Sequence, residues 1–101
     1  MRFDNSVASY GSARPFEREK MTFFYVYILQ SKAEPETFYV GFTDDLRVRL
    51  KVHNSGQVPH TAKFRPWIVK TAIAFTERQR AVHFERYLKS ASGRAFAKKR
   101  L

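Results

Sequence analysis

Five side chains in this sequence are of types that could take part in phosphodiester hydrolysis. Tyr27 and Tyr39 lie in two apolar, aromatic segments, and Glu85 lies much later in the chain. Between them, Arg49 and His53 are four residues apart in one polar segment. Hydrolysis needs an activated water, a cation beside the phosphorus as charge develops, and often a divalent metal held by a carboxylate. Tyrosine and histidine can handle the proton, arginine supplies the cation, and glutamate supplies the carboxylate.

Each of these residues also has a purely structural interpretation. A tyrosine in a strand commonly belongs to the core with its hydroxyl at the rim. Arg49 can be an ordinary surface charge, and His53 near a helix C-terminus can interact with the helix dipole. Glu85 can pair with Lys89 in a helix ion pair worth about 0.3–0.5 kcal/mol. No single residue therefore establishes a site by itself.

Composition and periodicity predict the elements that must position these side chains. β-Branched and aromatic residues indicate strands, and apolar residues three and four apart indicate helices. The predicted elements are strands over Phe23–Gln30, Phe38–Phe42 and Trp67–Phe75, helices over Thr43–Asn54 and Thr76–Lys89, and a basic turn or short helix after Ser92 and Gly93. The order β-β-α-β-α-α predicts a mixed α/β (α+β) domain with a small sheet, in which the first two strands form a hairpin.

Local signals define the predicted ends of the helices. Thr43, followed by two aspartates, is expected to cap the first helix, and Gly56 is expected to end it. Residues 55–66 are predicted to form a loop. The segment Thr76–Gln79 has the form of a capping box for the second helix. Gly41 inside the second strand indicates a bulge or a close approach by another backbone or a ligand.

The composition favours a polyanionic ligand. The chain has 101 residues, enough for one domain, with 19 Lys and Arg against 9 Asp and Glu and a net charge of +10. Such an excess of positive charge favours nucleic acid first and an anionic membrane surface second. Cysteine is absent, which excludes disulfides, Cys-ligated metals and thiol catalysis. Without a long apolar run or a signal peptide, a cytoplasmic location without a membrane is expected.

The first twenty residues differ from the rest of the chain. They are polar, show no helical or strand period, and hold four basic against three acidic residues. We expect residues 1–20 to form a disordered extension and residues 21–101 to form the domain that carries the positive charge.

The order of the candidate residues resembles that of the GIY-YIG nuclease superfamily. Tyr25-Val26-Tyr27 stands for the first motif and Tyr39-Val40-Gly41 for the second, followed by Arg49 and His53 and by the later Glu85. The segments YVYIL, FYVGFTDDLRVRL, HNSG, HTAKFRPW and AVHFERYLKS are similar to those of small stand-alone bacterial members. The resemblance covers Phe23 to Leu101 and implies a three-stranded antiparallel sheet flanked by helices, with metal-dependent cleavage of phosphodiesters.

The resemblance also implies roles for the site residues. Tyr27 would contact the nucleophilic water, and Tyr39 would line the same pocket. Arg49 would stabilise charge on the scissile phosphate, and His53 would assist proton transfer. Glu85 would bind the metal, Mg²⁺ or Mn²⁺, since one carboxylate plus waters suits magnesium.

Two departures from the family pattern stand out. Tyr25 replaces the first glycine of the namesake motif, and no Asn follows Asn54, whereas many family members have one after the metal-binding helix. Ser90, Ser92 or a water could take the place of that asparagine. The matching glycine, Gly41, would keep the backbone close to the site.

The sequence favours a metal-dependent endonuclease acting on DNA rather than RNA, possible substrates being structured or damaged DNA. A protein partner could supply specificity, because no DNA-recognition domain is visible. The alternatives are a nucleic-acid-binding module with this fold but little turnover, or a subunit of a repair or recombination complex. The predicted nucleic-acid-binding residues are Gly41, Lys63, Arg65, Arg94, Lys98, Lys99 and Arg100.

Overall fold

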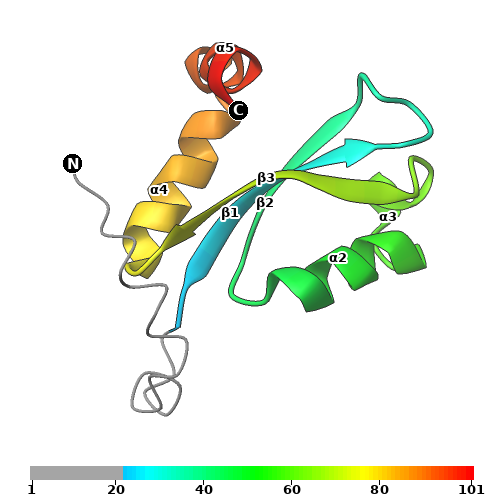
Figure 1. Ribbon diagram of the computed structural model, residues 1–101, viewed down its shortest axis with the longest axis horizontal. Helices are drawn as coiled ribbons and strands as arrows, with labels where there is room; N and C mark the ends of the chain where they lie inside the picture. The colour runs from blue at the N-terminus through cyan, green and yellow to red at the C-terminus, as the bar shows by residue number, and fades with distance from the viewer. Residues whose placement is uncertain (1–21) are drawn as a thin grey trace, which may run out of the picture.

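The computed structural model describes residues 22–101 and contains one sheet with helices on both of its faces (Figure 1). The predicted β-β-α-β-α-α order is confirmed, with one additional helical turn, α3, before the last strand. The predicted extension, residues 1–20, lies outside the described residues. The elements are β1 (Phe24–Ser31), β2 (Phe38–Thr43), α2 (Leu46–Ser55), α3 (Pro59–Ala62), β3 (Trp67–Phe75), α4 (Arg78–Leu88) and α5 (Ala91–Arg100).

The three strands form an antiparallel sheet in the order β2-β1-β3. Strand β1 is central because its middle residues are apolar on both faces, and Val26–Leu29 are all buried. In the register, Tyr27 lies opposite Gly41 of β2 on one side and opposite Ala72 of β3 on the other. The sheet therefore holds Tyr27 at its centre.

Alternation along β1 divides the core into two clusters, one on each face of the sheet. Val26 and Ile28 point to the face covered by α4 and α5. Tyr27 and Leu29 point to the face covered by α2, where they pack with Trp67. The first tyrosine of the candidate set therefore faces the helix that carries the arginine and the histidine.

Helix α2 begins later than predicted because Asp45, not Thr43, caps it. The Asp45 carboxylate accepts a hydrogen bond from the backbone N–H of Val48 at 3.1 Å. The Thr43 hydroxyl instead accepts from the N–H of Asp45 at 3.1 Å, in the turn before the helix. Gly56 ends the helix as predicted, with a φ of 87° that favours glycine.

The prediction of a loop over residues 55–66 is wrong at its centre, where Pro59–Ala62 form α3. Proline at the first helical turn has the φ that a helix needs and lacks an N–H that would otherwise be unpaired. The turn carries no side-chain cap, so the sequence holds little signal for it. It buries Thr61, which contacts the candidate site.

Two expectations for the last helices are wrong. Glu77 is the N-cap of α4 but makes no side-chain capping bond, so Thr76–Gln79 is not a capping box. The predicted break at Ser92 and Gly93 lies instead at Ser90, whose hydroxyl accepts from the N–H of Gly93 at 3.1 Å and caps α5. Gly93 lies inside α5. The position requires glycine, because a Cβ there would overlap the backbone of α4. The part of the chain that the structure describes has no helix long and apolar enough to cross a membrane.

Candidate active site

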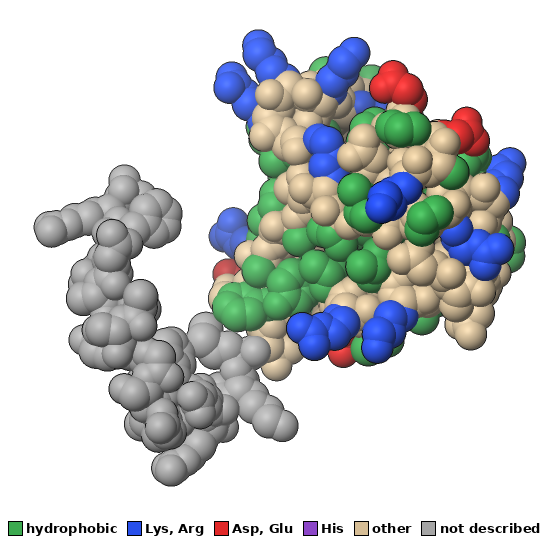
Figure 2. Space-filling view, turned by 45° about the vertical axis from the view of Figure 1, so that its right-hand side comes forward, with side chains coloured by type: hydrophobic (Ala, Val, Ile, Leu, Met, Phe, Trp, Pro, Cys, Tyr) green, Lys and Arg blue, Asp and Glu red, His purple; other side chains and the backbone are tan. Residues whose placement is uncertain are grey.

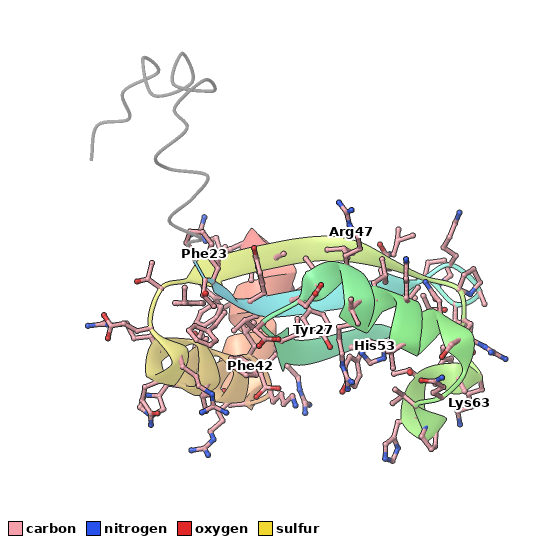
Figure 3. All side chains as sticks on the ribbon, turned by 90° about the horizontal axis from the view of Figure 1, so that it is seen from below. Phe23, Tyr27, Phe42, Arg47, His53 and Lys63 are labelled. Carbon is pink, nitrogen blue, oxygen red and sulfur yellow. The ribbon has the colours of Figure 1, made fainter. Side chains whose placement is uncertain are left out.

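The side chains of Tyr27 and His53 meet between the sheet and α2. The phenol Oη of Tyr27 lies 3.0 Å from Nε2 of His53, and the two residues are 1% and 0% exposed. Figure 3 looks onto α2 and shows the two labelled side chains next to each other. A hydrogen bond between two buried groups is held in one geometry by its surroundings, so the phenol and the imidazole form a fixed pair.

Gly41 creates the space in which the Tyr27 phenol lies. A Cβ at Gly41 would overlap the hydroxyl and the ring carbons of Tyr27 directly across the strand pair. The glycine is thus required by the packing of the tyrosine, and its predicted contact with nucleic acid stays a prediction.

Thr61 of α3 holds the other nitrogen of His53. Its hydroxyl oxygen lies 3.0 Å from Nδ1, and the hydroxyl donates to the carbonyl of Val58 at 3.3 Å. The hydroxyl proton is thereby engaged, so the oxygen accepts the Nδ1–H of His53. This tautomer leaves a lone pair on Nε2, which accepts the hydrogen bond from the Tyr27 hydroxyl.

Trp67 and Asn54 hold α2 and α3 against the start of β3. The indole N–H of Trp67 donates to the carbonyl of Thr61 at 2.9 Å. The Asn54 amide donates to the Trp67 carbonyl at 3.1 Å and accepts from its N–H at 2.6 Å. These contacts fix the position of Thr61 relative to His53, and they engage Asn54 in structure.

Tyr39 and Arg49 complete the group on this face of the sheet. The Tyr39 ring lies 4.8 Å from the His53 ring and 6.4 Å from the Tyr27 ring, measured between centroids. Arg49 is one helical turn before His53 and is partly exposed. The structure therefore brings together four of the five predicted site residues on two strands and one helix.

The surroundings shift the pKa values of the central pair in opposite directions. Burial raises the pKa of Tyr27 above 10, an effect that Tyr39 and Glu85 reinforce and that Arg49 opposes. Burial and the positive charge of Arg49 lower the pKa of His53 below 6.5. Near neutral pH the phenol is therefore protonated and the imidazole is neutral, as the hydrogen bond between them requires.

Glu85 is on α4, which covers the other face of the sheet. Its negative charge contributes the smallest of the effects that raise the pKa of Tyr27. The Glu85 side chain is 21% exposed, and its carboxylate oxygen Oε2 forms an ion pair with Lys89 Nζ at 3.2 Å. The helix ion pair that the sequence allowed for Glu85 is thus present.

The residues present fit a metal with few protein ligands. Within residues 22–101, no cluster of three or more His, Cys, Asp or Glu side chains has the geometry of a metal site. Glu85 offers one hard oxygen ligand on α4, and its partner Lys89 has a half-exposed side chain. A hard divalent metal that keeps several waters and takes one or two carboxylates would suit this donor set.

The predicted nucleic-acid-binding residues do not form one surface. Arg94 and Lys98 line a cleft beside α5, whereas the exposed Lys99 and Arg100 do not. Lys63 lies beside α3, at the opposite end of the molecule from α5 (Figures 1 and 3). Figure 2 shows basic side chains gathered at the top of the molecule, over α5, and a second group at the bottom.

Sequence reasoning missed Thr61, which lies in a segment predicted to be a loop. A lone threonine carries no spacing signal, and only the contact with His53 identifies its role. Ser90 does not replace the missing asparagine, because its hydroxyl caps α5 and donates to the carbonyl of Tyr87 at 2.6 Å.

Comparison with known proteins gives a family match over the described fold. The model of the GIY-YIG catalytic domain matches residues 23–100. "Structure-specific endonuclease subunit SLX1" of Scheffersomyces stipitis is 38% identical over 71 residues, which cover 63% of this chain and 21% of that protein. "UPF0213 protein YazA" of Bacillus subtilis is 35% identical over 68 residues, 66% of this chain and 65% of that protein. The chain thus spans about a fifth of the length of the SLX1 relative and about two thirds of the bacterial one.

Proposed function

Because the chain belongs to the GIY-YIG catalytic-domain family, we propose that it is a divalent-metal-dependent endonuclease that hydrolyses phosphodiester bonds in DNA. The observation that carries this proposal is the buried hydrogen bond between Tyr27 and His53, with Arg49 acting on both residues and Glu85 on Tyr27. A core that needed only packing would not require two titratable groups with opposite pKa shifts at its centre.

The pair offers a path for the proton of the attacking water. With its pKa raised, Tyr27 is a poor base by itself, because its phenolate forms only at high pH. A water that gives its proton to the phenol oxygen is assisted when the phenol proton moves to Nε2 of His53. The Nδ1–H group of His53 keeps its hydrogen bond to Thr61 throughout, and this bond holds Nε2 toward the phenol. His53 therefore acts as the final proton acceptor.

Arg49 and Glu85 serve the phosphate. The Arg49 guanidinium supplies positive charge where the phosphorus gains negative charge, and Tyr39 lines the approach beside His53. Glu85 would hold the divalent metal, which supplies Lewis-acid stabilisation of the phosphate when bound. Mg²⁺ and Mn²⁺ both suit a single carboxylate ligand with waters.

DNA is the proposed substrate because of the family and because of the net charge of +10. One relative is named a structure-specific endonuclease subunit, which supports a structured DNA substrate and a protein partner for this chain. A role in DNA repair and a cytoplasmic location stay predictions from the sequence.

The test is cleavage of supercoiled plasmid and branched DNA with Mg²⁺ or Mn²⁺. We expect nicking by the wild type and none by Arg49→Gln or Glu85→Gln. Glu77→Gln is the matched control, because Glu77 belongs to an exposed ion pair on the same helix. Equal trace activity in the wild type and Glu85→Gln would indicate a contaminant and contradict the proposal.

A second candidate function is nucleic-acid binding with little turnover. Two observations favour this second function. Tyr27 is only 1% exposed, and the carboxylate of Glu85 is paired with the ammonium of Lys89. Binding that weakens steeply with salt, without metal-dependent cleavage, would support this alternative.

A further inference from the structure

A cleft of about 760 Å³ lies between α5 and the sheet face at the start of β2. Its floor is apolar and includes Ile28, Val40 and Leu88. This volume is in the range of sites that hold small organic groups, and it is too small for a base-paired duplex. We call it the β2–α5 cleft.

The rim of the cleft is basic. Lys70, Lys89, Arg94 and Lys98 line it against a single acidic residue, Glu36. Arg94 and Lys98 are one helical turn apart, so both project from the same side of α5. Figure 2 shows basic and hydrophobic side chains intermixed on the face of the molecule below α5. This combination suits a ligand with an apolar ring and negative charges at its edge.

Phe38 gives the cleft an exposed aromatic surface. Phe38 lines the cleft and is 47% exposed. Lys70 Nζ lies 5.7 Å from the ring centroid, so a cation already accompanies the ring. Nucleobases stack on such rings with little dependence on sequence, at about 1–3 kcal/mol per base.

The cleft reaches the candidate active site along α4, through one residue. Tyr39 also lines the cleft, but its ring packs with Tyr27 and His53 on the other face of the sheet. Lys89 lines the cleft, and its ammonium pairs with Glu85. A ligand in the cleft therefore lies one turn of α4 from Glu85, and the basic rim with its exposed aromatic ring favours the proposed DNA substrate as the occupant.

We propose that the β2–α5 cleft binds an unpaired nucleotide of the DNA strand cut at the tyrosine site. The base stacks on Phe38 over the apolar floor, and the adjoining phosphates contact Arg94 and Lys98. The inference rests on the proposed function, because it takes the strand at the site as its ligand. It assigns a preference for unpaired DNA to the catalytic domain itself.

The test is equilibrium binding of a single-stranded oligonucleotide that contains one 2-aminopurine, with the matching duplex as the comparison. The full chain is used as Tyr27→Phe in EDTA, so that binding is measured without cleavage. We expect tighter binding of the single strand, with quenching of the 2-aminopurine. Phe38→Leu keeps apolar area but loses stacking, so it should remove the quenching and weaken single-strand binding about tenfold, with duplex binding unchanged.

A charge-matched pair of variants separates the cleft from general electrostatics. Arg94→Gln with Lys98→Gln should lower the slope of log affinity against log salt by about 1.4, because two single-strand phosphate contacts are lost. Arg47→Gln with Lys51→Gln removes an Arg and a Lys at the same spacing from exposed positions on α2 outside the cleft. This control should leave the salt slope unchanged.

Equal losses in the two double variants, or equal affinity for single strand and duplex, would overturn the proposal. So would capture of an acidic aromatic polymer, poly(Glu,Tyr), that depends on Phe38 while the single strand shows no such dependence, since the cleft would then fit a protein partner. Quenched binding by a wild type that cuts no DNA would contradict the proposed function alone. Cleavage without any effect of Phe38→Leu on binding would contradict the cleft alone.

Discussion

The phenol oxygen of Tyr27 and Nε2 of His53 lie 3.0 Å apart in the interior, although the residues are 26 positions apart in the chain. Strand β1 supplies the first group and α2 the second, and Thr61 of α3 orients the imidazole between them. Three separate elements therefore converge on one hydrogen-bonded pair, and the following experiments test the proposed role of this pair.

The fall of the cleavage rate at low pH should reflect protonation of His53. Because the pKa of His53 is lowered below 6.5, the neutral imidazole persists to a lower pH than usual. We expect the single-turnover rate to fall with acidification only below about pH 6.5. The rate is measured from about pH 4.5 to about pH 8, a range that brackets this pKa. A limb centred above the usual histidine value would contradict the assignment.

The same shift makes folding stability depend on pH. The unfolded chain protonates His53 near pH 6.5, whereas the folded chain does so only at lower pH. Protons therefore favour the unfolded state, and the free energy of unfolding should fall as pH drops from about 6.5. Urea unfolding of the wild type and His53→Gln measures this, and an equal slope in both proteins would contradict it.

Thr61→Val should destabilise the protein and disturb His53. The variant leaves the buried Nδ1–H without an acceptor, at a cost of about 1–3 kcal/mol. Thr61→Ser keeps the hydroxyl and should largely retain stability. Urea unfolding measures the cost, and NMR titration of the imidazole shows whether its pKa moves with the hydroxyl. If Thr61→Val matches Thr61→Ser in both measurements, Thr61 does not position His53.

Gly41→Ala should displace Tyr27. The added Cβ overlaps both the hydroxyl and the ring carbons, so we expect a loss of about 1–3 kcal/mol. Removal of the hydroxyl in Tyr27→Phe should relieve this only in part, since the ring overlap persists. Ala72→Ser, at the exposed partner on the other side of Tyr27, is the control and should change stability by less than about 0.5 kcal/mol. Thermal unfolding compares the variants, and a neutral Gly41→Ala would contradict the packing argument.

Lys89 should compete with metal for Glu85. The ion pair joins side chains one helical turn apart, so its release adds little, and Lys89→Gln should tighten Mn²⁺ binding about twofold. Arg80→Gln breaks the comparable exposed pair with Glu77 and should leave Mn²⁺ affinity unchanged. Electron paramagnetic resonance of free Mn²⁺ measures both, and binding that survives Glu85→Gln would show that Glu85 is not the ligand.

The elements could be predicted where the pattern was long. The run of β-branched and aromatic residues in Phe23–Gln30 predicts a buried strand, and the structure buries Val26–Leu29. The short α3 could not be predicted, because one turn has no period to detect. The capping residues were misassigned because Asp45 and Thr43 both have side chains suited to a cap, and only the backbone geometry decides between them.

The site could be predicted only as a set of residues. The order from Tyr27 to Glu85 identified the candidates, and the structure brings Tyr27, Tyr39, Arg49 and His53 together. The sequence could not identify Thr61, because its role depends on a contact between α3 and His53 of α2. That Lys63 and α5, which carries Arg94, lie at opposite ends of the molecule also depends on the fold, because the net charge does not show where the charges lie in space.

The most direct test of the account is a cycle of single-turnover cleavage rates for Tyr27→Phe, His53→Gln and the double variant. Tyr25→Phe on the same strand serves as the control, and near-UV circular dichroism establishes that each variant is folded. If the two side chains form one proton path, each single variant should lose about 10²-fold or more, and the double variant should be no slower than the slower single one. Full activity in Tyr27→Phe, or losses that multiply in the double variant, would contradict it.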